Sequence, residues 1–437
     1  MRLGLRMGLN SRGAGGGGDI PSLDLQFAAD KTLTARKGPT PTFTRASTAR
    51  FVGSDGLIQS AAINTPRFDH DPVTFASKGL LIEESRTNQI TYSENLADPS
   101  WSTFSTASGA NVTSTNPSGA TTTTRITANA GTDTGRVRLK LLTIPSASYA
   151  VTASCFVKAG NSNFGLVSMA FNKSGVGAIR NCLAHIVFST GVITKSGTSN
   201  ADFTVTSTAF TDGWYRITIS ATSNASLTVE DQVVLSTGLS FNGVGGSGTF
   251  AGTETVFAWG AQLEAGSFPT SYIPTTTASV VRSGDVCSIT GSDFTGMYNQ
   301  SEGTFFTQST KISTNANAFI FHVSDNSFLN GLDLRYNSAT NPAALMNVSN
   351  VNQLTGFNAT ITSGSSPKQA VAYKLNDCAY SANGASVIID TSALIPTVSR
   401  LNIGGAFNNT LAINGHIASV RYFKKRLSNS KIQAITV

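Results

Sequence analysis

The chain has 437 residues, of which 40% are hydrophobic and only 13% are charged, and its formal net charge is +7. This length allows two or three domains, and the small charged fraction means that Ser, Thr, Asn and Gly must supply most of the polar surface. The basic residues are scattered rather than gathered in a stripe, which argues against nucleic-acid binding. No run of about 20 apolar residues occurs, so the sequence predicts no membrane insertion.

Four widely spaced cysteines, with no C-x-x-C pair, argue against a zinc site. We expect buried free thiols, and a disulfide between Cys155 and Cys182 is the alternative. The first ten residues are interrupted too early by Arg6 to form a signal peptide. The sequence therefore predicts neither a metal nor a cofactor.

Residues 1–22 are basic and Gly-rich, and the glycine run at 15–18 is costly to order. The alternating leucines near the start could add a strand to the sheet of a partner. Two interpretations stay open: a disordered tail, and an attachment peptide that becomes ordered on docking. In the second, the candidate attachment residues are Arg2, Leu3, Leu5, Arg6, Leu9 and Arg12.

Residues 23–95 contain many turn signals and few periodic runs, which is typical of an irregular β collar. Irregular backbone needs side-chain partners for its unpaired amides and carbonyls. Arginines and carboxylates are well placed to supply them as ion pairs, together with Asn88. We therefore expect a structural network, with a sugar or metal site as the alternative, among Arg45, Arg67, Arg86, Asp55, Asp69, Asp71, Glu83 and Glu84.

Residues 96–275 alternate apolar and polar side chains over many short runs, the pattern of a β-sandwich. In residues 149–157 the odd positions are apolar and should face one core. Pro269 and Pro274 each fix φ and remove a backbone donor, so they end the last strand before a linker at 276–284.

Residues 285–437 repeat this pattern as a second sandwich. Asn383-Gly384 between two strand candidates predicts a tight hairpin, and Ser428 should cap a short terminal helix. The predicted fold class is all-β: two tandem β-sandwich or jelly-roll domains, with an irregular N-terminal collar and an extended N-terminal peptide.

Glycoside hydrolysis on such a fold needs two carboxylates that face each other. Glu83 and Glu84 are adjacent, so a strand points them to opposite faces, and Asp333 stands alone. The four histidines form no H-x-H or H-E-x-x-H cluster, and His416 is expected to be a partnered core or edge residue. No catalytic residue is predicted.

Sugar binding needs an exposed aromatic platform with amides and carboxylates around it. Trp259 lies on an alternating apolar face and Trp214 begins a strand, so we expect both in the core. Trp101 follows a loop-like stretch and is the best exposed candidate. The candidate carbohydrate-binding residues are Trp101, Asp325, Asn326, Asp333 and Tyr336.

Several stretches resemble a family of bacteriophage virion proteins built around concanavalin A-like and carbohydrate-binding-module-like jelly rolls. The resemblance in the collar lies in residues 43–49 (FTRASTA), 55–58 (DGLI), 64–69 (NTPRFD), 79–83 (GLLIE) and 86–88 (RTN). It continues in residues 259–264 (WGAQLE) and 270–275 (TSYIPT), with Arg282 and Asp285. Residues 403–404, 414–417 and 426–428, with Tyr422, resemble the closing strands of laminin-G-like domains.

This resemblance implies a carbohydrate-binding-module-like domain at 96–275 and a concanavalin A-like, laminin-G-like domain at 285–437. It implies a non-enzymatic virion protein, made in the host cytoplasm and displayed on the phage particle as a tail or head fibre. The expected partners are other virion proteins, further copies of the chain in a homotrimer, and host surface glycan. The alternatives are a capsid or baseplate decoration protein without glycan binding, and a glycan depolymerase tailspike.

Overall fold

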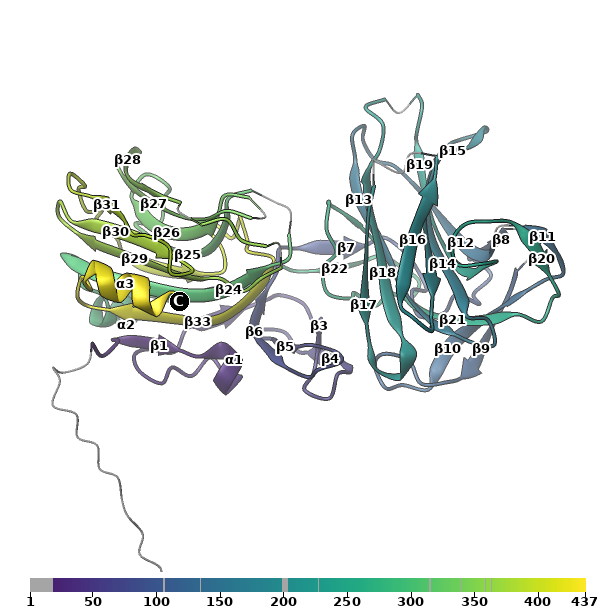
Figure 1. Ribbon diagram of the computed structural model, residues 1–437, viewed down its shortest axis with the longest axis horizontal. Coiled ribbons are helices and arrows are strands. Elements are labelled where there is room, and N and C mark those ends of the chain that lie inside the picture. Colours follow the sequence, from purple (N-terminus) through teal and green to yellow (C-terminus); the bar gives the residue numbers. More distant parts are fainter. Residues whose placement is uncertain are drawn as a thin grey trace, which may run out of the picture.

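A computed structural model describes residues 19–104, 107–133, 135–198, 203–226, 228–313, 316–338, 340–357, 359–362 and 364–437. Strands dominate these residues and form two separate bodies, which confirms the all-β fold class (Figure 1). None of the helices in these residues is long and apolar enough to cross a membrane. The candidate attachment residues Arg2, Leu3, Leu5, Arg6, Leu9 and Arg12 lie outside the described ranges.

The first body, which we call the middle sandwich, consists of two six-stranded sheets that face each other across a core. One sheet has the order β17-β18-β13-β21-β10-β9 and the other β16-β15-β14-β19-β12-β8. As the alternation predicted, Val151, Ala153, Cys155 and Val157 all enter that core. The strands are β8 (Ser102–Phe104), β9 (Ala107–Thr113), β10 (Thr122–Ala128), β12 (Gly135–Thr143), β13 (Ala150–Ala159), β14 (Phe164–Lys173), β15 (Gly177–Val187), β16 (Val192–Gly197), β17 (Phe203–Ala209), β18 (Tyr215–Thr222), β19 (Gln232–Ser240) and β21 (Thr255–Ala265), with a side hairpin of β11 (Gly131–Asp133) and β20 (Gly248–Phe250) and a 3-10 turn, η1 (Thr211–Gly213).

The second body, which we call the C-terminal sandwich, pairs an eight-stranded sheet with a seven-stranded one. The first has the order β31-β30-β29-β24-β33-β6-β5, with β1 also beside β33, and the second β2-β23-β32-β25-β26-β27-β28. Its elements are β1 (Leu23–Leu25), α1 (Phe27–Asp30), β2 (Thr42–Thr44), β5 (Phe68–His70), β6 (Ser77–Ile82), β23 (Val286–Thr290), α2 (Gly291–Met297), β24 (Glu302–Lys311), β25 (Ala318–Ser324), β26 (Gly331–Tyr336), β27 (Pro342–Val348), β28 (Val351–Gly356), β29 (Lys368–Lys374), β30 (Cys378–Ala382), β31 (Ile388–Asp390), β32 (Arg400–Ile403), β33 (Gly415–Phe423) and α3 (Asn429–Ile435).

The collar segment, residues 23–95, supplies four of these strands. Strand β1 pairs with β33 so that Leu23 lies opposite Tyr422, and β6 pairs farther along the same strand, with Leu80 opposite Ile417. Strand β5 continues the sheet beyond β6, and β2 adds to the edge of the second sheet at β23. The side chains of β1 and β6 are buried in the same core as those of β33. The C-terminal sandwich is therefore completed by the beginning of the chain.

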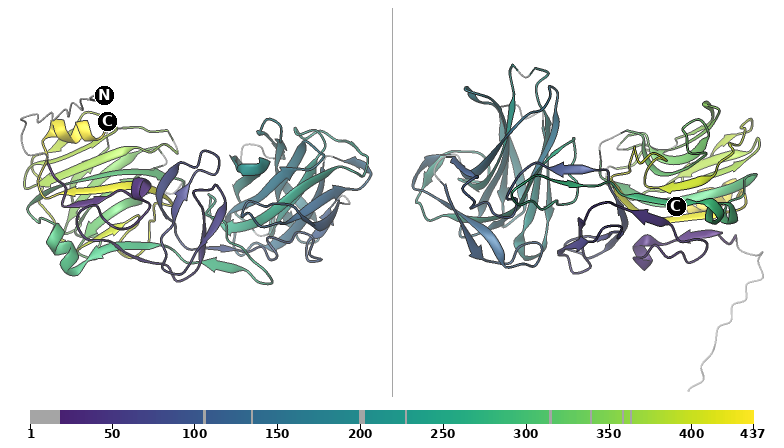
Figure 2. Two further views of the ribbon diagram at one scale, coloured as in Figure 1. Left: turned by 90° about the horizontal axis from the view of Figure 1, so that it is seen from below. Right: turned by 180° about the vertical axis from the view of Figure 1, so that it is seen from behind.

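A short two-stranded ladder joins the two bodies. Strands β7 (Arg86–Asn88) and β22 (Val280–Arg282) run antiparallel, with Asn88 opposite Val280, and they lie between the sandwiches in Figure 1. The chain leaves the C-terminal sandwich through β7 and returns through β22. The middle sandwich is thus an insertion. A second hairpin, β3 (Ala49–Val52) and β4 (Ile58–Ala61), also lies between the two bodies, below the ladder in the view of Figure 1. Figure 2 shows the two bodies and the segments between them from two other sides.

Three local predictions are confirmed. Asn383 and Gly384 have φ values of 47° and 69°, the left-handed pair that a tight hairpin turn requires. The side chain of Ser428 accepts a hydrogen bond from the backbone of Lys431 and caps α3. All four cysteines are free and buried, so the alternative Cys155–Cys182 disulfide is not formed, and burial raises the pKa of Cys155 to about 12.

Candidate functional site

A hollow of about 260 Å³ lies on the outer face of the seven-stranded sheet of the C-terminal sandwich. Strand β26 alternates there: Leu332 and Leu334 enter the core, so Asp333 and Arg335 point to the opposite face. The residues that line the hollow are Asn317, Phe319, His322, Phe328, Gly331, Asp333, Arg335, Leu345, Asn347, Asn350 and Leu411.

A ladder of flat groups forms one wall of the hollow. The guanidinium of Arg335 lies 4.4 Å from the ring centroid of Phe319. The ring of Phe319 stacks on His322 with centroids 5.1 Å apart, and His322 stacks on Phe328 at 5.7 Å. The side chain at the end of the ladder, Phe328, is 40% exposed. The ring of Phe328 also contacts Phe407, with centroids 4.8 Å apart. A partly exposed aromatic ring is therefore present beside polar groups.

The charged pair in the hollow is held in a fixed orientation. Arg335 donates two hydrogen bonds to Asp333, from Nε to Oδ1 and from Nη2 to Oδ2, each 2.5 Å long. Burial nevertheless raises the pKa of Asp333 to about 6, against the opposing effect of Arg335. Burial and, as a smaller effect, the positive charge of Arg335 also lower the pKa of His322 to about 4. His322 is therefore neutral at pH 7, and its Nδ1 has no hydrogen-bond partner in the described structure.

Of the predicted carbohydrate-binding residues, Asp333 lines this hollow and the others do not. Asp325 and Asn326 lie in the turn that joins β25 to β26, where Asp325 accepts hydrogen bonds from Ser327 and Asn330. Tyr336 points to the other face and is buried in the core, with its hydroxyl 2.8 Å from the carbonyl oxygen of Ser309.

The prediction that Trp101 is exposed is wrong. Its side chain is 1% exposed and packs in the core of the middle sandwich, and its Nε1 donates to the carbonyl of Tyr92 at 3.3 Å. A buried ring cannot serve as a platform for a sugar at the surface. The expectation that Trp214 and Trp259 are core residues is confirmed, since both are buried in one aromatic cluster.

A second polar centre, the junction network, lies where the two sandwiches meet. We define it as Arg45, Arg67, Glu83, Ser271, Arg282 and Asp285. Asp285 accepts from Arg45 at 3.1 Å and from Arg67 at 2.5 Å, while Arg67 also pairs with Glu83 at 2.7 Å.

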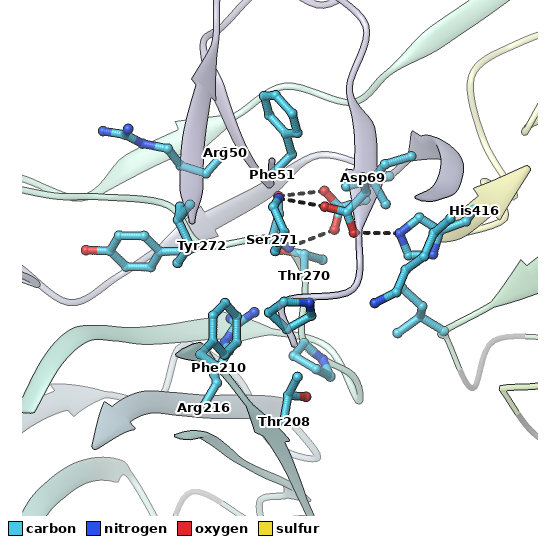
Figure 3. Close-up of a pocket in the computed structure, with 18 of the residues that line it drawn as sticks. Arg50, Phe51, Asp69, Thr208, Phe210, Arg216, Thr270, Ser271, Tyr272 and His416 are labelled. Atoms are coloured by element: carbon cyan, nitrogen blue, oxygen red, sulfur yellow. Dashed lines mark hydrogen bonds and ion pairs between the residues drawn. The ribbon is translucent and has the colours of Figure 1, made fainter. Parts of the chain in front are cut away.

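Ser271 connects this network to the middle sandwich. It follows β21, and its backbone N and side-chain Oγ both donate to Glu83 at 2.7 Å (Figure 3). Burial by itself would raise the pKa of Glu83, but Arg282 and Arg67 outweigh it and hold that pKa well below its usual range. The carboxylate therefore stays charged and links both bodies.

The structural network predicted in the collar is present, with partners that differ in part. Arg86 pairs with Glu84 at 2.7 Å, and the amide of Asn88 donates to the carbonyls of Ala261 and Ile273. Asp69 pairs with a histidine rather than an arginine: its Oδ2 lies 2.8 Å from Nε2 of His416. His416 is therefore a buried residue with a partner, as expected. The central carboxylate, Asp285, was not among the predicted partners because it lies about 200 residues away along the chain.

Sequence reasoning also missed most of the hollow. Its aromatic members sit on β25 and in the following turn, and β25 contains a register shift between Phe319 and Phe321. That bulge changes which side chains share a face, so a strict period of two cannot find them. A usable signal did exist in β26, where Asp333 and Arg335 are two residues apart and must share one face.

Comparison with known proteins gives no family assignment. No family model matches the chain, and no curated protein matches it. Among solved structures, the CBM40 domain of a Ruminococcus gnavus IT-sialidase is 16% identical, covering 33% of this chain and 86% of that one, with a TM-score of 0.29.

Two further structures are similar at the same low level. Domains LG4-5 of the mouse laminin alpha1 chain are 12% identical, over 66% of this chain and 87% of that one, with a TM-score of 0.25. A Trypanosoma rangeli sialidase is 8% identical, over 76% of this chain and 68% of that one, with a TM-score of 0.26. Likenesses this distant say nothing about which residues of this chain bind or act.

Proposed function

We propose that this chain is a non-enzymatic virion protein of a bacteriophage, a tail or head fibre that attaches through residues 1–22 and contacts host surface glycans with its β-sandwiches. The phage assignment is supported by the sequence motifs of the collar and of residues 259–275. The glycan contact is supported by one observation above all, the hollow on the outer face of the C-terminal sandwich.

The chemistry of the hollow suits a sugar ring. The exposed part of the Phe328 ring can pack against the C–H face of a pyranose, while the side-chain amides of Asn317, Asn347 and Asn350 can form hydrogen bonds with its hydroxyl groups. A few fixed polar groups around an apolar surface are what orients a small ligand. The rigid pair of Asp333 and Arg335 adds both an acceptor and a donor at a defined position.

Binding rather than hydrolysis fits this arrangement. Glycoside hydrolysis uses two carboxyl groups that flank the scissile bond. Asp333 is the single carboxylate among the residues that line the hollow, and both of its oxygens are already bonded to Arg335. A neutral His322, stacked between two rings, serves better as a packing and hydrogen-bonding surface than as a proton carrier.

The test is a glycan array probed with the full chain and with two variants. We expect the intact protein to bind host surface glycans, and Phe328→Ala to weaken that binding about tenfold or more, because truncation of a central aromatic anchor is costly. Phe357→Ala is the matched control, since Phe357 is 61% exposed and lies outside the hollow.

Equal loss in both variants, or no loss in either, would contradict a binding role for the hollow. Absence of any binding to glycans or host cells would favour the decoration protein, and release of reducing ends from host polysaccharide would favour the depolymerase.

A further inference from the structure

A second cavity, which we call the junction cleft, opens between the middle sandwich and the β3–β4 hairpin. Its volume is about 180 Å³, smaller than the ~300–1,000 Å³ typical of sites for drug-sized ligands. Its lining comes from both bodies, with Phe51 and Arg50 on one side and Thr208, Phe210 and Arg216 on the other (Figure 3). A cavity of this size suits one monosaccharide rather than a chain of them.

One wall of the junction cleft belongs to an aromatic cluster. Phe156, Phe210, Trp259 and Tyr272 are buried together, with the ring centroids of Phe156 and Phe210 5.1 Å apart and those of Trp259 and Tyr272 4.8 Å apart. Phe210 and Tyr272 reach the cleft itself. Phe210 is 8% exposed and Tyr272 3%, so a part of each ring is available to a small ligand inside the cavity, and a tryptophan in contact with these rings can report on its binding.

Arg216 brings a positive charge into this apolar setting. Its neighbours on β18, Ile217 and Ile219, enter the core of the middle sandwich, so Arg216 stands on the outer face of the sheet. Its Nε and Nη2 donate hydrogen bonds to the hydroxyl of Ser154, at 3.3 and 3.0 Å, and its guanidinium carbon lies 5.6 Å from the ring centroid of Phe156. Within the described part of the chain, Arg216 has no carboxylate at ion-pair distance and its Nη1 forms no hydrogen bond.

The acidic groups of the junction cleft do not neutralise Arg216 directly. The two that line it, Asp69 and Glu83, are engaged by His416 and by Arg67 with Ser271 respectively. Burial lowers the pKa of Arg216, and the more distant Glu264 and Glu83 offset that effect only in part. A guanidinium that is desolvated and lacks a close counter-charge favours the arrival of an anion.

We propose that the junction cleft binds the carboxylate of an acidic monosaccharide unit, with Arg216 donating to the carboxylate and Phe210 packing against the sugar ring. Ser154 holds the guanidinium in place and leaves Nη1 free to donate. Thr208 and Thr270, which also line the cleft, offer hydroxyl groups to the ring. This site is separate from the hollow on the C-terminal sandwich and does not depend on it.

The experiment titrates the full chain with D-glucuronate and with D-glucose, two pyranoses that differ in one carboxylate. Binding is followed by calorimetry and by tryptophan fluorescence, because Trp259 belongs to the aromatic cluster. We expect glucuronate to bind at least tenfold more tightly than glucose, and Arg216→Gln to abolish this preference, since a hydrogen bond to a charged group is worth about that factor.

Two controls make the result decisive. Arg216→Lys keeps the charge but loses the two-point contact with Ser154, so it should retain part of the preference while melting like the parent protein. Phe328→Ala should leave glucuronate binding unchanged, which separates this site from the hollow. Equal affinity for the two sugars, absence of saturable glucuronate binding, or an unchanged preference in a folded Arg216→Gln protein would each overturn the proposal.

Discussion

Asp285 shows how single residues hold this molecule together. Its two oxygens contact Arg45 and Arg67, and a backbone amide, that of Glu83, donates to one of them at 2.9 Å. Removing charges from water is expensive, and a buried pair recovers the cost only when every lone pair is satisfied. The junction network meets that condition only in part, because Nε of Arg67 and Nε of Arg282 are buried without a hydrogen-bond partner in the described structure. We therefore expect it to fix the orientation of the segments it joins more than it adds to their stability.

Another buried group, His185, makes stability depend on pH. Its two ring nitrogens contact Ser240 and Ser196 at 2.8 and 2.7 Å, and burial lowers its pKa to about 4. Between that value and the usual 6.5, the unfolded chain binds a proton that the folded chain refuses. Stability should therefore fall as the pH drops through this window, by up to about 3 kcal/mol.

Urea unfolding of the parent protein and of His185→Gln at about pH 6.5, 5.5 and 4.5, a range that begins at the ordinary pKa of histidine, tests this dependence. The variant should show a shallower loss of unfolding free energy on acidification. The lowered pKa of His322, about 4, adds a slope of the same sign, and the raised pKa of Asp333, about 6, adds one of the opposite sign. The difference between the two proteins therefore isolates the contribution of His185. Parallel curves for the two proteins would show that His185 does not carry the effect.

What could be predicted for single residues depended on periodicity. Trp259 is buried as predicted, but not on the predicted face. Ala261 and Leu263 enter the core of the middle sandwich, whereas Trp259 belongs to the separate aromatic cluster, because the ladder between β13 and β21 shifts register at this point. Trp101 has no periodic neighbours, because it directly precedes a strand of three residues, Ser102–Phe104. The turn residues before Trp101 suggested that it is exposed. In the folded chain its ring packs into the core of the middle sandwich, and these contacts between distant segments could not be predicted from the local sequence.

At the scale of elements, the length of a strand determined whether the sequence could predict it. Long strands such as β13 and β14, with ten residues each, show their alternation clearly. Strands β1, β2 and β5 have three residues each, too few to show a period. Their partners lie hundreds of residues away, so the contribution of the collar segment to the C-terminal sandwich was not predictable.

The β7–β22 ladder leads to a prediction about excision. Replacing residues 89–279 by Asn-Gly should leave a folded C-terminal sandwich, because Asn88 and Val280 are register partners and a two-residue turn can close them. Circular dichroism, gel filtration and amide dispersion in NMR spectra would check it. The excised protein should be less stable than the parent, since Glu83 loses its bonds to Ser271.

The matched comparison is residues 285–437 alone. That fragment lacks β1, β2, β5 and β6 and exposes an edge of β33, the kind of unpaired edge that promotes aggregation. We expect it to be insoluble or unfolded. A well-folded 285–437 fragment, or an unfolded excised protein, would show that the collar segment is not an integral part of the C-terminal sandwich.

At the scale of the whole molecule, the first described residues lie beside the same sandwich that contains the last ones. Ser22 donates its backbone amide to Tyr422 at 2.7 Å, and Figure 1 places β1 at the end of the long axis opposite the middle sandwich. If residues 1–22 hold the chain to a particle, as we propose, the middle sandwich points away from that particle.

Labelled virions can test this orientation. Val176 is 73% exposed on the middle sandwich and Leu375 is 57% exposed on the C-terminal sandwich. Because the four native cysteines are buried, Val176→Cys or Leu375→Cys supplies one accessible thiol for a gold label. The gold label at position 176 should lie farther from the particle than the label at position 375. Particles made with a chain that lacks residues 1–18 should carry no gold label. The reverse order of distances would refute the orientation.

The chain leaves the C-terminal sandwich through β7 and returns beside it through β22. This arrangement has a consequence for the evolution of the protein. Asn88 and Val280, which are register partners, mark the points where the chain enters and leaves the whole middle sandwich. Recombination at the β7–β22 ladder could replace the middle sandwich by another domain, while the proposed attachment through residues 1–22 would be unchanged.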